Sequence, residues 1–326
     1  MRRLLITAAT VAATALTLSA CGTTEPAADA HPKPSEGITV KDGTGKEVTL
    51  DKAATKVVAT EWNVVESLVS LGVDPVGVAD VKGYKTWDTS VPLRNEPKDI
   101  GTRGEPSMDT IASLSPDLIV ATTDLPPAAV KQMREVAPVL EVTSAKGSDQ
   151  IGQMLENIDL IARATGTTDR AKTLRSDFEA KLEEGRGALA DAGLDGARIA
   201  FADGYVTSNQ VSLRPYTSTS LIGAVNERLG LKNAWKVQGD ESYGLGSTDV
   251  EGLTALPADV RFAYIGSDGD KNSNPFAGAL AENSVWTSLP FVKKGDVHRL
   301  PDGIWMFGGP GSMQAYVDAI VAALTK

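Results

Sequence analysis

Hydrophobic and polar positions follow one another along the chain as short buried strands and amphipathic helices would. Short β-branched or apolar runs cover residues 56–60, 76–79, 118–122 and 139–142. Between the first two runs, helical spacing up to the capping residue Gly72 joins Val64, Val65, Leu68, Val69 and Leu71. Strands that alternate with helices predict a parallel-sheet α/β domain. Before them, a Gly43–Gly45 turn between β-rich flanks predicts a hairpin over residues 38–50.

The pattern changes at Ser148. Apolar residues recur at helical spacing from Ile151 to Ile161, Gly166 interrupts them, and a second helical pattern follows from Leu174 to Leu182. Strand-like runs return at 198–203, 261–265 and 297–300. The chain therefore predicts two α/β lobes joined by a single long helix. We place the N-terminal lobe at 37–147, the connecting helix at 148–168 and the C-terminal lobe at 169–326.

The two predicted lobes share a short sequence echo. Residues 109–118 match residues 251–260 in the positions of two carboxylates and three apolar side chains, and each segment reads as a short helix that leads into a strand. Helix-then-strand patterns are common, so chance can produce such a match. The equivalent places in the two lobes favour duplication or convergent architecture instead.

The N-terminus carries an export signal. Arg2 and Arg3 precede an apolar run from Leu4 to Leu18 that is too short to span a bilayer, and small residues then lead to Cys21. This ending looks like a bacterial lipobox, in which residues 1–20 are removed and Cys21 is lipidated. Cleavage after Ala20 of an ordinary signal is the alternative. Residues 21–36 are polar and read as a flexible tether.

Composition narrows the chemistry. Loss of Arg2 and Arg3 takes the net charge from −10 to −12, and such an acidic body argues against nucleic-acid binding. With one cysteine there is no internal disulfide. The two histidines, His31 and His298, lie in the tether and in a predicted strand, which nearly excludes a His/Cys metal site. We expect no cofactor, and any metal would bring its ligands with the cargo.

An ordered set of motifs runs from about residue 56 to the C-terminus. It consists of Glu61-Trp62, Gly77–Asp80, Tyr84 with Trp87, Gly101–Pro106, Trp286–Val292 and Trp305–Gly308. Together these resemble the periplasmic ferric-hydroxamate siderophore-binding proteins of bacterial ABC importers. The resemblance implies two lobes with a shallow cleft, and a receptor that captures its ligand outside the cell membrane. We expect this receptor to be a monomer, anchored through the lipid on Cys21. Such a receptor passes its ferric siderophore to permease subunits that a cytoplasmic ATPase drives.

The resemblance also implies ligand-binding residues. Arg103 matches the arginine that donates hydrogen bonds to hydroxamate oxygens, although an ion pair with Glu105 is an alternative role. Aromatic faces bury the carbon linkers of such a ligand, and the matching positions are Trp87, Tyr84, Tyr243, Trp305 and Phe307. We expect the other tryptophans, Trp62, Trp235 and Trp286, to be scaffold.

One departure from the family pattern affects the ligand. Leu125 stands where the family has a tyrosine partner to the arginine, so one donor is missing. We expect Arg214 to replace it from the other lobe, with an ordinary exposed loop arginine as the alternative. Two arginines suit a hydroxamate complex with some negative charge, whereas a tricatecholate calls for a more basic pocket.

The same resemblance implies a role for the first carboxylate of each matching segment. Asp109 and Glu251 fall on the positions where the family docks one carboxylate of each lobe onto permease arginines. Charge pairs of this kind orient a complex more than they tighten it. Stabilisation of a helix N-terminus by an acid is the alternative role for both residues.

Other functions fit less well. The chain lacks the G-x-S-x-G elbow, the Walker A lysine loop and the H-E-x-x-H helix, and the glycine-rich Gly308–Ser312 reads as a turn before the last helix. We therefore expect no enzyme, and a surface adhesion module would leave the cleft pattern unexplained. The same fold with haem, cobalamin or a carboxylate siderophore remains an alternative, with Tyr84, Tyr205 or Tyr243 as haem ligands.

Overall fold

The structure is a computed structural model that describes residues 37–208 and 210–326. The predicted signal peptide, the lipidated Cys21 and the tether all lie outside the described residues. The described part begins with the predicted hairpin, in which β1 (Ile38–Lys41) pairs antiparallel with β2 (Glu47–Leu50). No described helix is long and apolar enough to cross a membrane.

The first lobe is built on a parallel sheet. Its strands run in the order β5 (Lys98–Asp99), β4 (Gly77–Val78), β3 (Val57–Ala59), β6 (Leu118–Thr122) and β7 (Val139–Val142). Every residue of β3, β6 and β7 is buried, which explains why these strands are mostly apolar and do not alternate. The charged exception, Glu141 in β7, pairs with Arg134. The helices around this sheet are α1 (Trp62–Leu71), α2 (Val81–Trp87), α3 (Met108–Leu114) and α4 (Pro127–Arg134).

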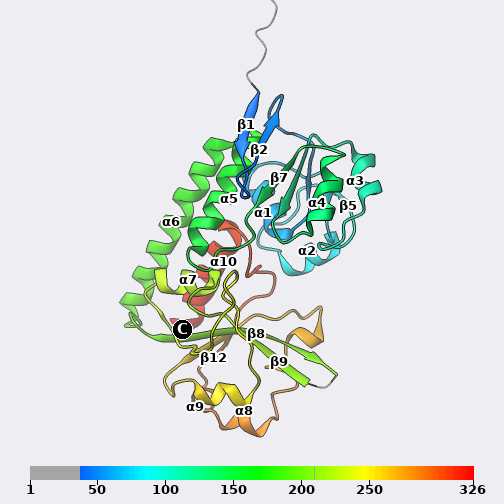
Figure 1. Ribbon diagram of the computed structural model, residues 1–326. Helices are drawn as coiled ribbons and strands as arrows, with labels where there is room; N and C mark the ends of the chain where they lie inside the picture. The colour runs from blue at the N-terminus through cyan, green and yellow to red at the C-terminus, as the bar shows by residue number, and fades with distance from the viewer. Residues whose placement is uncertain (1–36, 209) are drawn as a thin grey trace, which may run out of the picture. The chain divides into compact units, whose positions relative to one another are not determined.

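The second lobe has its own sheet (Figure 1). The strands β10 (Lys232–Asn233), β8 (Arg198–Thr207), β11 (Arg261–Tyr264) and β12 (Val297–Arg299) are parallel, and β9 (Gln210–Pro215) pairs antiparallel with β8. The sequence predicted β8, β11 and β12 but not the β8–β9 hairpin. The helices of this lobe are α7 (Leu221–Arg228), η1 (Glu251–Ala255), η2 (Lys271–Ser273), α8 (Ser284–Ser288), α9 (Pro290–Lys294) and α10 (Pro310–Leu324).

Two helices, rather than one, connect the cores of the lobes. Gly166 adopts a φ of 71° and ends α5 (Gln150–Thr165), and the chain restarts as α6 (Thr168–Asp191). The first half of α5 packs in the C-terminal core and its second half in the N-terminal core. Helix α6 also contributes to both, with Leu174 in the N-terminal core and Phe178 in the C-terminal one. The expected long helix is α5, and α6 packs against it as a second connecting helix (Figure 1).

A buried pair of carboxyls joins the first helix to the last. Glu66 of α1 is fully buried, and its Oε1 accepts a hydrogen bond from the Ser312 N–H at 2.9 Å. Asp88, at the end of α2, accepts one from the Ser312 hydroxyl at 3.3 Å. A Cβ on Gly308 would lie 2.2 Å from Glu66 Oε2, so only glycine lets the chain pass there. The predicted turn at Gly308–Ser312 is therefore also the cradle of a buried acid.

Burial raises the pKa of both carboxyls, and the charge of Glu66 raises the pKa of Asp88 further. Folding consequently retains a proton at this pair at neutral pH. The contribution of this proton to the free energy of unfolding is fully present below the pKa of a carboxyl in the unfolded chain. This contribution decreases as the pH rises from there toward the raised pKa of the folded state.

We expect Glu66→Gln to flatten this pH dependence, because the glutamine amide supplies a permanent donor to Asp88 and keeps an oxygen for the Ser312 N–H. From about pH 5 to pH 8 the free energy of unfolding of the wild type should fall relative to that of the variant, with a limiting slope of about 1.4 kcal/mol per pH unit. Urea unfolding across this range measures it. The exposed Glu105→Gln is the control, and parallel curves for the wild type and Glu66→Gln would contradict the prediction.

Candidate functional site

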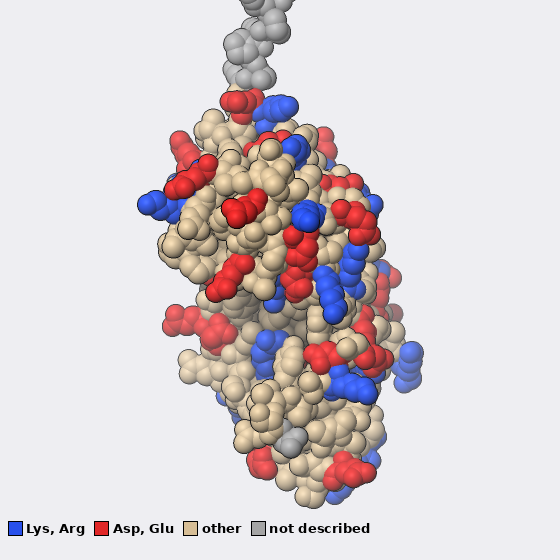
Figure 2. Space-filling model, turned by 90° about the vertical axis from the view of Figure 1, so that its right-hand side faces the viewer, with Lys and Arg blue, Asp and Glu red and all other residues tan. Residues whose placement is uncertain are grey.

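Five of the seven predicted ligand-binding residues line one pocket. It has a volume of about 430 Å³, and Figure 2 shows a hollow on this side of the molecule with basic and acidic side chains at its edges. The predicted residues in its wall are Arg103, Arg214, Tyr243, Trp305 and Phe307. The other lining residues are Glu61, Asn63, Gly104, Tyr205 and Leu245. We call this pocket the cleft.

Arg103 is held at the cleft by a tight loop. An isolated bridge between Gly101 and Pro106 closes the loop, and Gly101 has a φ of 100° that favours glycine. The guanidinium lies over Trp62, 4.0 Å from the ring centroid, and Arg103 Nη1 donates to Glu61 Oε1 at 2.6 Å. The ion partner is thus Glu61, and not Glu105 as the sequence alternative had it. Among the described residues, none accepts a hydrogen bond from the remaining N–H groups of Arg103.

Arg214 reaches the cleft from the β8–β9 hairpin. Asp203 on β8 stands directly opposite Arg214 on β9, and the carboxylate accepts from both Nε, at 2.9 Å, and Nη2 of the guanidinium. Burial raises the pKa of Asp203, and the charge of Arg214 opposes this shift. The alternative of an exposed loop arginine is wrong, because Arg214 is a half-buried strand residue whose partner fixes its position.

A row of aromatic rings forms the wall between the two arginines. Trp305 packs edge-on against Trp62 with ring centroids 4.8 Å apart, and Phe307 continues the row 5.1 Å from Trp305. Tyr243 follows, 5.6 Å from Phe307, and its hydroxyl donates to Asp124 of the N-terminal lobe. Burial and this hydrogen bond raise the pKa of Tyr243. The tyrosine therefore bridges the two sides of the cleft as a neutral donor.

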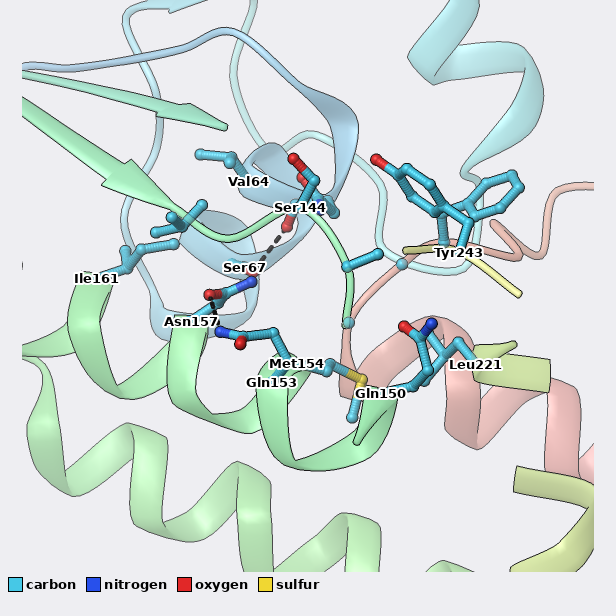
Figure 3. Close-up of a pocket in the computed structure, with 16 residues that line it drawn as sticks. Val64, Ser67, Ser144, Gln150, Gln153, Met154, Asn157, Ile161, Leu221 and Tyr243 are labelled. Atoms are coloured by element: carbon cyan, nitrogen blue, oxygen red, sulfur yellow. Dashed lines mark hydrogen bonds between the residues drawn. The ribbon is translucent and has the colours of Figure 1, made fainter. Parts of the chain in front are cut away.

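A smaller cavity lies next to the cleft and shares Asn63, Tyr243 and Phe307 with it. Figure 3 shows that α5 turns its amide side chains toward this cavity, where Gln153 donates to Asn157 at 3.0 Å. Its volume of about 30 Å³ is enough for a water molecule among polar partners. The cavity beside the cleft is therefore lined by amides and apolar side chains, and none of the described residues that line it is charged.

Two predicted aromatic residues are not at the cleft. Tyr84 is fully buried, and its hydroxyl donates to the Val91 carbonyl, so the expectation that Tyr84 contacts a ligand is wrong. Apolar spacing on α2 turns this ring into the N-terminal core. Trp87 is half-buried against the same core and does not line the cleft. Leu125, which replaces the family tyrosine, packs in a second N-terminal cluster.

Sequence reasoning missed the carboxylates of the site and considered Tyr205 only as a haem ligand. Glu61 lies two residues after the end of β3, and the carboxyl ends of parallel strands are where α/β proteins bind ligands, so its position was a usable signal. Tyr205 is two residues after Asp203 on the same face of β8, and it is 38% exposed. No sequence signal pairs Asp203 with Arg214 unless the hairpin register is known.

Comparison with known proteins gives the family. The family described as "Periplasmic binding protein" matches residues 57–303. The chain belongs to this family. The match confirms that it is a binding protein and not an enzyme. Among residues 37–208 and 210–326, no three His, Cys, Asp or Glu side chains are grouped to hold a metal ion.

Several relatives of this binding protein have iron-related names. The probable siderophore-binding lipoprotein YfiY of Bacillus subtilis is 26% identical over 90% of this chain and 89% of its own length. The iron(3+)-hydroxamate-binding protein FhuD of Escherichia coli is 24% identical over 82% and 86%, and the Fe(3+)-citrate-binding protein YfmC of B. subtilis is 26% identical over 83% and 78%.

A solved structure confirms the predicted two-lobe fold. The siderophore-binding protein FhuD of Vibrio cholerae, crystallised with Fe³⁺-Desferal, aligns with a TM-score of 0.74 at 23% identity. The alignment covers 83% of this binding protein and 98% of that chain.

The sequence echo has a structural counterpart in the binding protein. Helix α3 leads into β6 beside β3, and η1 leads into β11 beside β8. The second carboxylate of each matching segment binds at the start of a central strand. Asp117 accepts the N–H of Lys56, directly before β3, at 2.9 Å, and Asp259 pairs with Arg198, the first residue of β8, at 2.6 Å. The first carboxylates, Asp109 and Glu251, are exposed at the start of α3 and η1.

We expect Asp203→Asn and Arg214→Leu to be coupled, because each removes the partner of the other. A double-mutant cycle by urea unfolding should give an interaction free energy of about 0.5–3 kcal/mol. Asparagine is close to the size of aspartate, so packing is kept while the bidentate charge pair is lost. Additive effects of the two substitutions would show that the pair does not hold Arg214.

Proposed function

We propose that this binding protein captures ferric siderophores of the hydroxamate type and delivers them to the permease of an ABC importer. The observation that carries the proposal is the cleft itself, in which Arg103 and Arg214 flank a row of aromatic rings. The relatives named for siderophores and for iron(3+)-hydroxamate support the same ligand class.

The ligand chemistry fits these walls. A ferric trihydroxamate places its oxygen atoms around the iron and carries apolar linkers on its outside. The N–H groups of Arg103 that have no acceptor among residues 37–208 and 210–326 are oriented donors for those oxygens. The rings of Trp305, Phe307, Tyr243 and the exposed Tyr205 bury the linkers without fixing a single orientation. Arg214, from the C-terminal lobe, stands in for the tyrosine donor that Leu125 replaces, because the Tyr243 hydroxyl already donates to Asp124.

Membrane attachment and docking complete the proposal. Lipidation of Cys21 keeps the receptor at the outer face of the membrane that holds the permease, and YfiY is likewise named a lipoprotein. Asp109 and Glu251, one on each lobe, are exposed and form no ion pair within the described residues. They are therefore available to arginines on the two permease subunits.

We expect Arg103→Ala to weaken binding of ferrioxamine and ferrichrome by about 1.5–3 kcal/mol, the range for hydrogen bonds to a charged group. Tryptophan fluorescence of the full-length protein in detergent measures this in titrations with both ligands, ferric citrate, ferric enterobactin, haem and cobalamin. Quenching by haem or cobalamin alone would overturn the hydroxamate assignment. Quenching by ferric citrate alone would favour the ligand class named for YfmC.

We expect the double variant Asp109→Ala, Glu251→Ala to bind ligand as the wild type does and to lose uptake, because both residues lie outside the cleft. Uptake of ⁵⁵Fe-loaded ferrioxamine by cells that carry the variant measures this. The matched control is Asp117→Ala, a change in the same echo that removes a structural carboxylate. Uptake at the wild-type rate in the double variant would rule out docking through these carboxylates.

A further inference from the structure

Both arginines of the cleft carry a carboxylate partner. Arg103 pairs with Glu61, and Arg214 pairs with Asp203, so the formal charges of these four groups cancel. Asp124 adds a further acid where it accepts the Tyr243 hydroxyl. Figure 2 shows acidic as well as basic side chains around the hollow. The cleft therefore offers guanidinium donors without a net positive charge.

The two carboxylates differ in their access to a ligand. The Asp203 side chain is 5% exposed and lies behind Arg214, where it positions the guanidinium. The Glu61 side chain is 24% exposed and lines the cleft. Its Oε1 also accepts the Trp62 N–H at 3.0 Å, as the cap of α1, so backbone geometry keeps this carboxylate at the mouth. A bound complex must lie next to Glu61 whenever it contacts Arg103.

Ferric siderophores of similar size differ strongly in charge. Three singly charged hydroxamates neutralise Fe³⁺, whereas three doubly charged catecholates leave a trianion. An arginine without a carboxylate partner attracts a trianionic complex more strongly than a neutral one. A fixed carboxylate beside the arginine repels the trianion and so cancels this attraction. Selection against a competitor by a repulsive charge is a general device of specific binding sites.

We propose that Glu61 is a specificity-determining residue that sets the charge of the ferric complex accepted by the cleft. Its carboxylate neutralises Arg103, admits neutral complexes and rejects trianionic ones. This inference rests on the proposed function, and it assigns to one side chain the choice between two siderophore classes.

The test compares two ligands on three proteins. Ferrichrome serves as the neutral trihydroxamate and ferric enterobactin as the trianionic tricatecholate, titrated by tryptophan fluorescence into the full-length protein in detergent. The proteins are the wild type, Glu61→Gln and Glu105→Gln. Glu105 is exposed on the Arg103 loop and does not line the cleft. Glu105→Gln therefore changes the net charge of the protein as Glu61→Gln does, but outside the cleft.

In Glu61→Gln the Kd of ferric enterobactin should fall at least about tenfold relative to that of ferrichrome, and added salt should reduce the change. In Glu105→Gln the ratio should stay within about twofold. Glu61→Ser removes the same charge and keeps a side chain that caps helices, so it replaces Glu61→Gln if the latter unfolds.

An unchanged ratio in both Glu61 variants, or an equal shift in Glu105→Gln, would overturn the role of Glu61. A wild type that binds ferric enterobactin more tightly than ferrichrome would also overturn it, while uptake of siderophores would stand. Failure of every ferric siderophore to bind the wild type would instead remove the proposed function, and this inference with it.

Discussion

The buried carboxyl of Glu66 fixes how the two lobes of this binding protein meet. A carboxyl without water must find hydrogen-bond donors, and Glu66 finds one in the Ser312 N–H at the first turn of α10. The segment Gly308–Ser312 must therefore run close beside α1. Trp62 lies one turn before Glu66 on α1, and Trp305 and Phe307 directly precede the cradle. One buried contact thus brings Trp62 against the cleft residue Trp305.

The same contact explains the position of Arg103. Trp62 and Trp305 meet edge-on and present their faces to the guanidinium, which lies 4.0 Å from one ring centroid and 5.5 Å from the other. Glu61 then holds the guanidinium from the N-terminus of α1. Helix α1 consequently supplies the carboxylate partner, the stacking surface and, through Glu66, the anchor to the opposite lobe. The guanidinium is thus held in place where the oxygen atoms of the ligand are expected to accept its hydrogen bonds.

Two guanidiniums with carboxylate partners give the cleft a particular electrostatic character. Unpaired arginines would attract any anionic iron complex, and the acidic body of the chain would oppose this only at long range. Local pairing keeps directional donors in place while it removes most of the field they would produce. The cavity beside α5 is likewise uncharged, since amides and apolar side chains line it.

Local patterns were sufficient for most of the fold. Apolar runs located β3, β6, β7, β8, β11 and β12, and Gly72 and Gly166 ended helices as glycines in the left-handed region do. Resemblance located Arg103, Trp305 and Phe307 at the cleft. The sequence by itself thus determined the order of elements, the two lobes and part of the wall. Only the tertiary structure decided which charges pair. Arg103 pairs with Glu61 and not with the nearby Glu105. The register of β8 and β9 places Arg214 opposite Asp203, and the side chain of Tyr84 is buried in the N-terminal core. Each outcome depends on packing between residues distant along the chain, which no local pattern encodes.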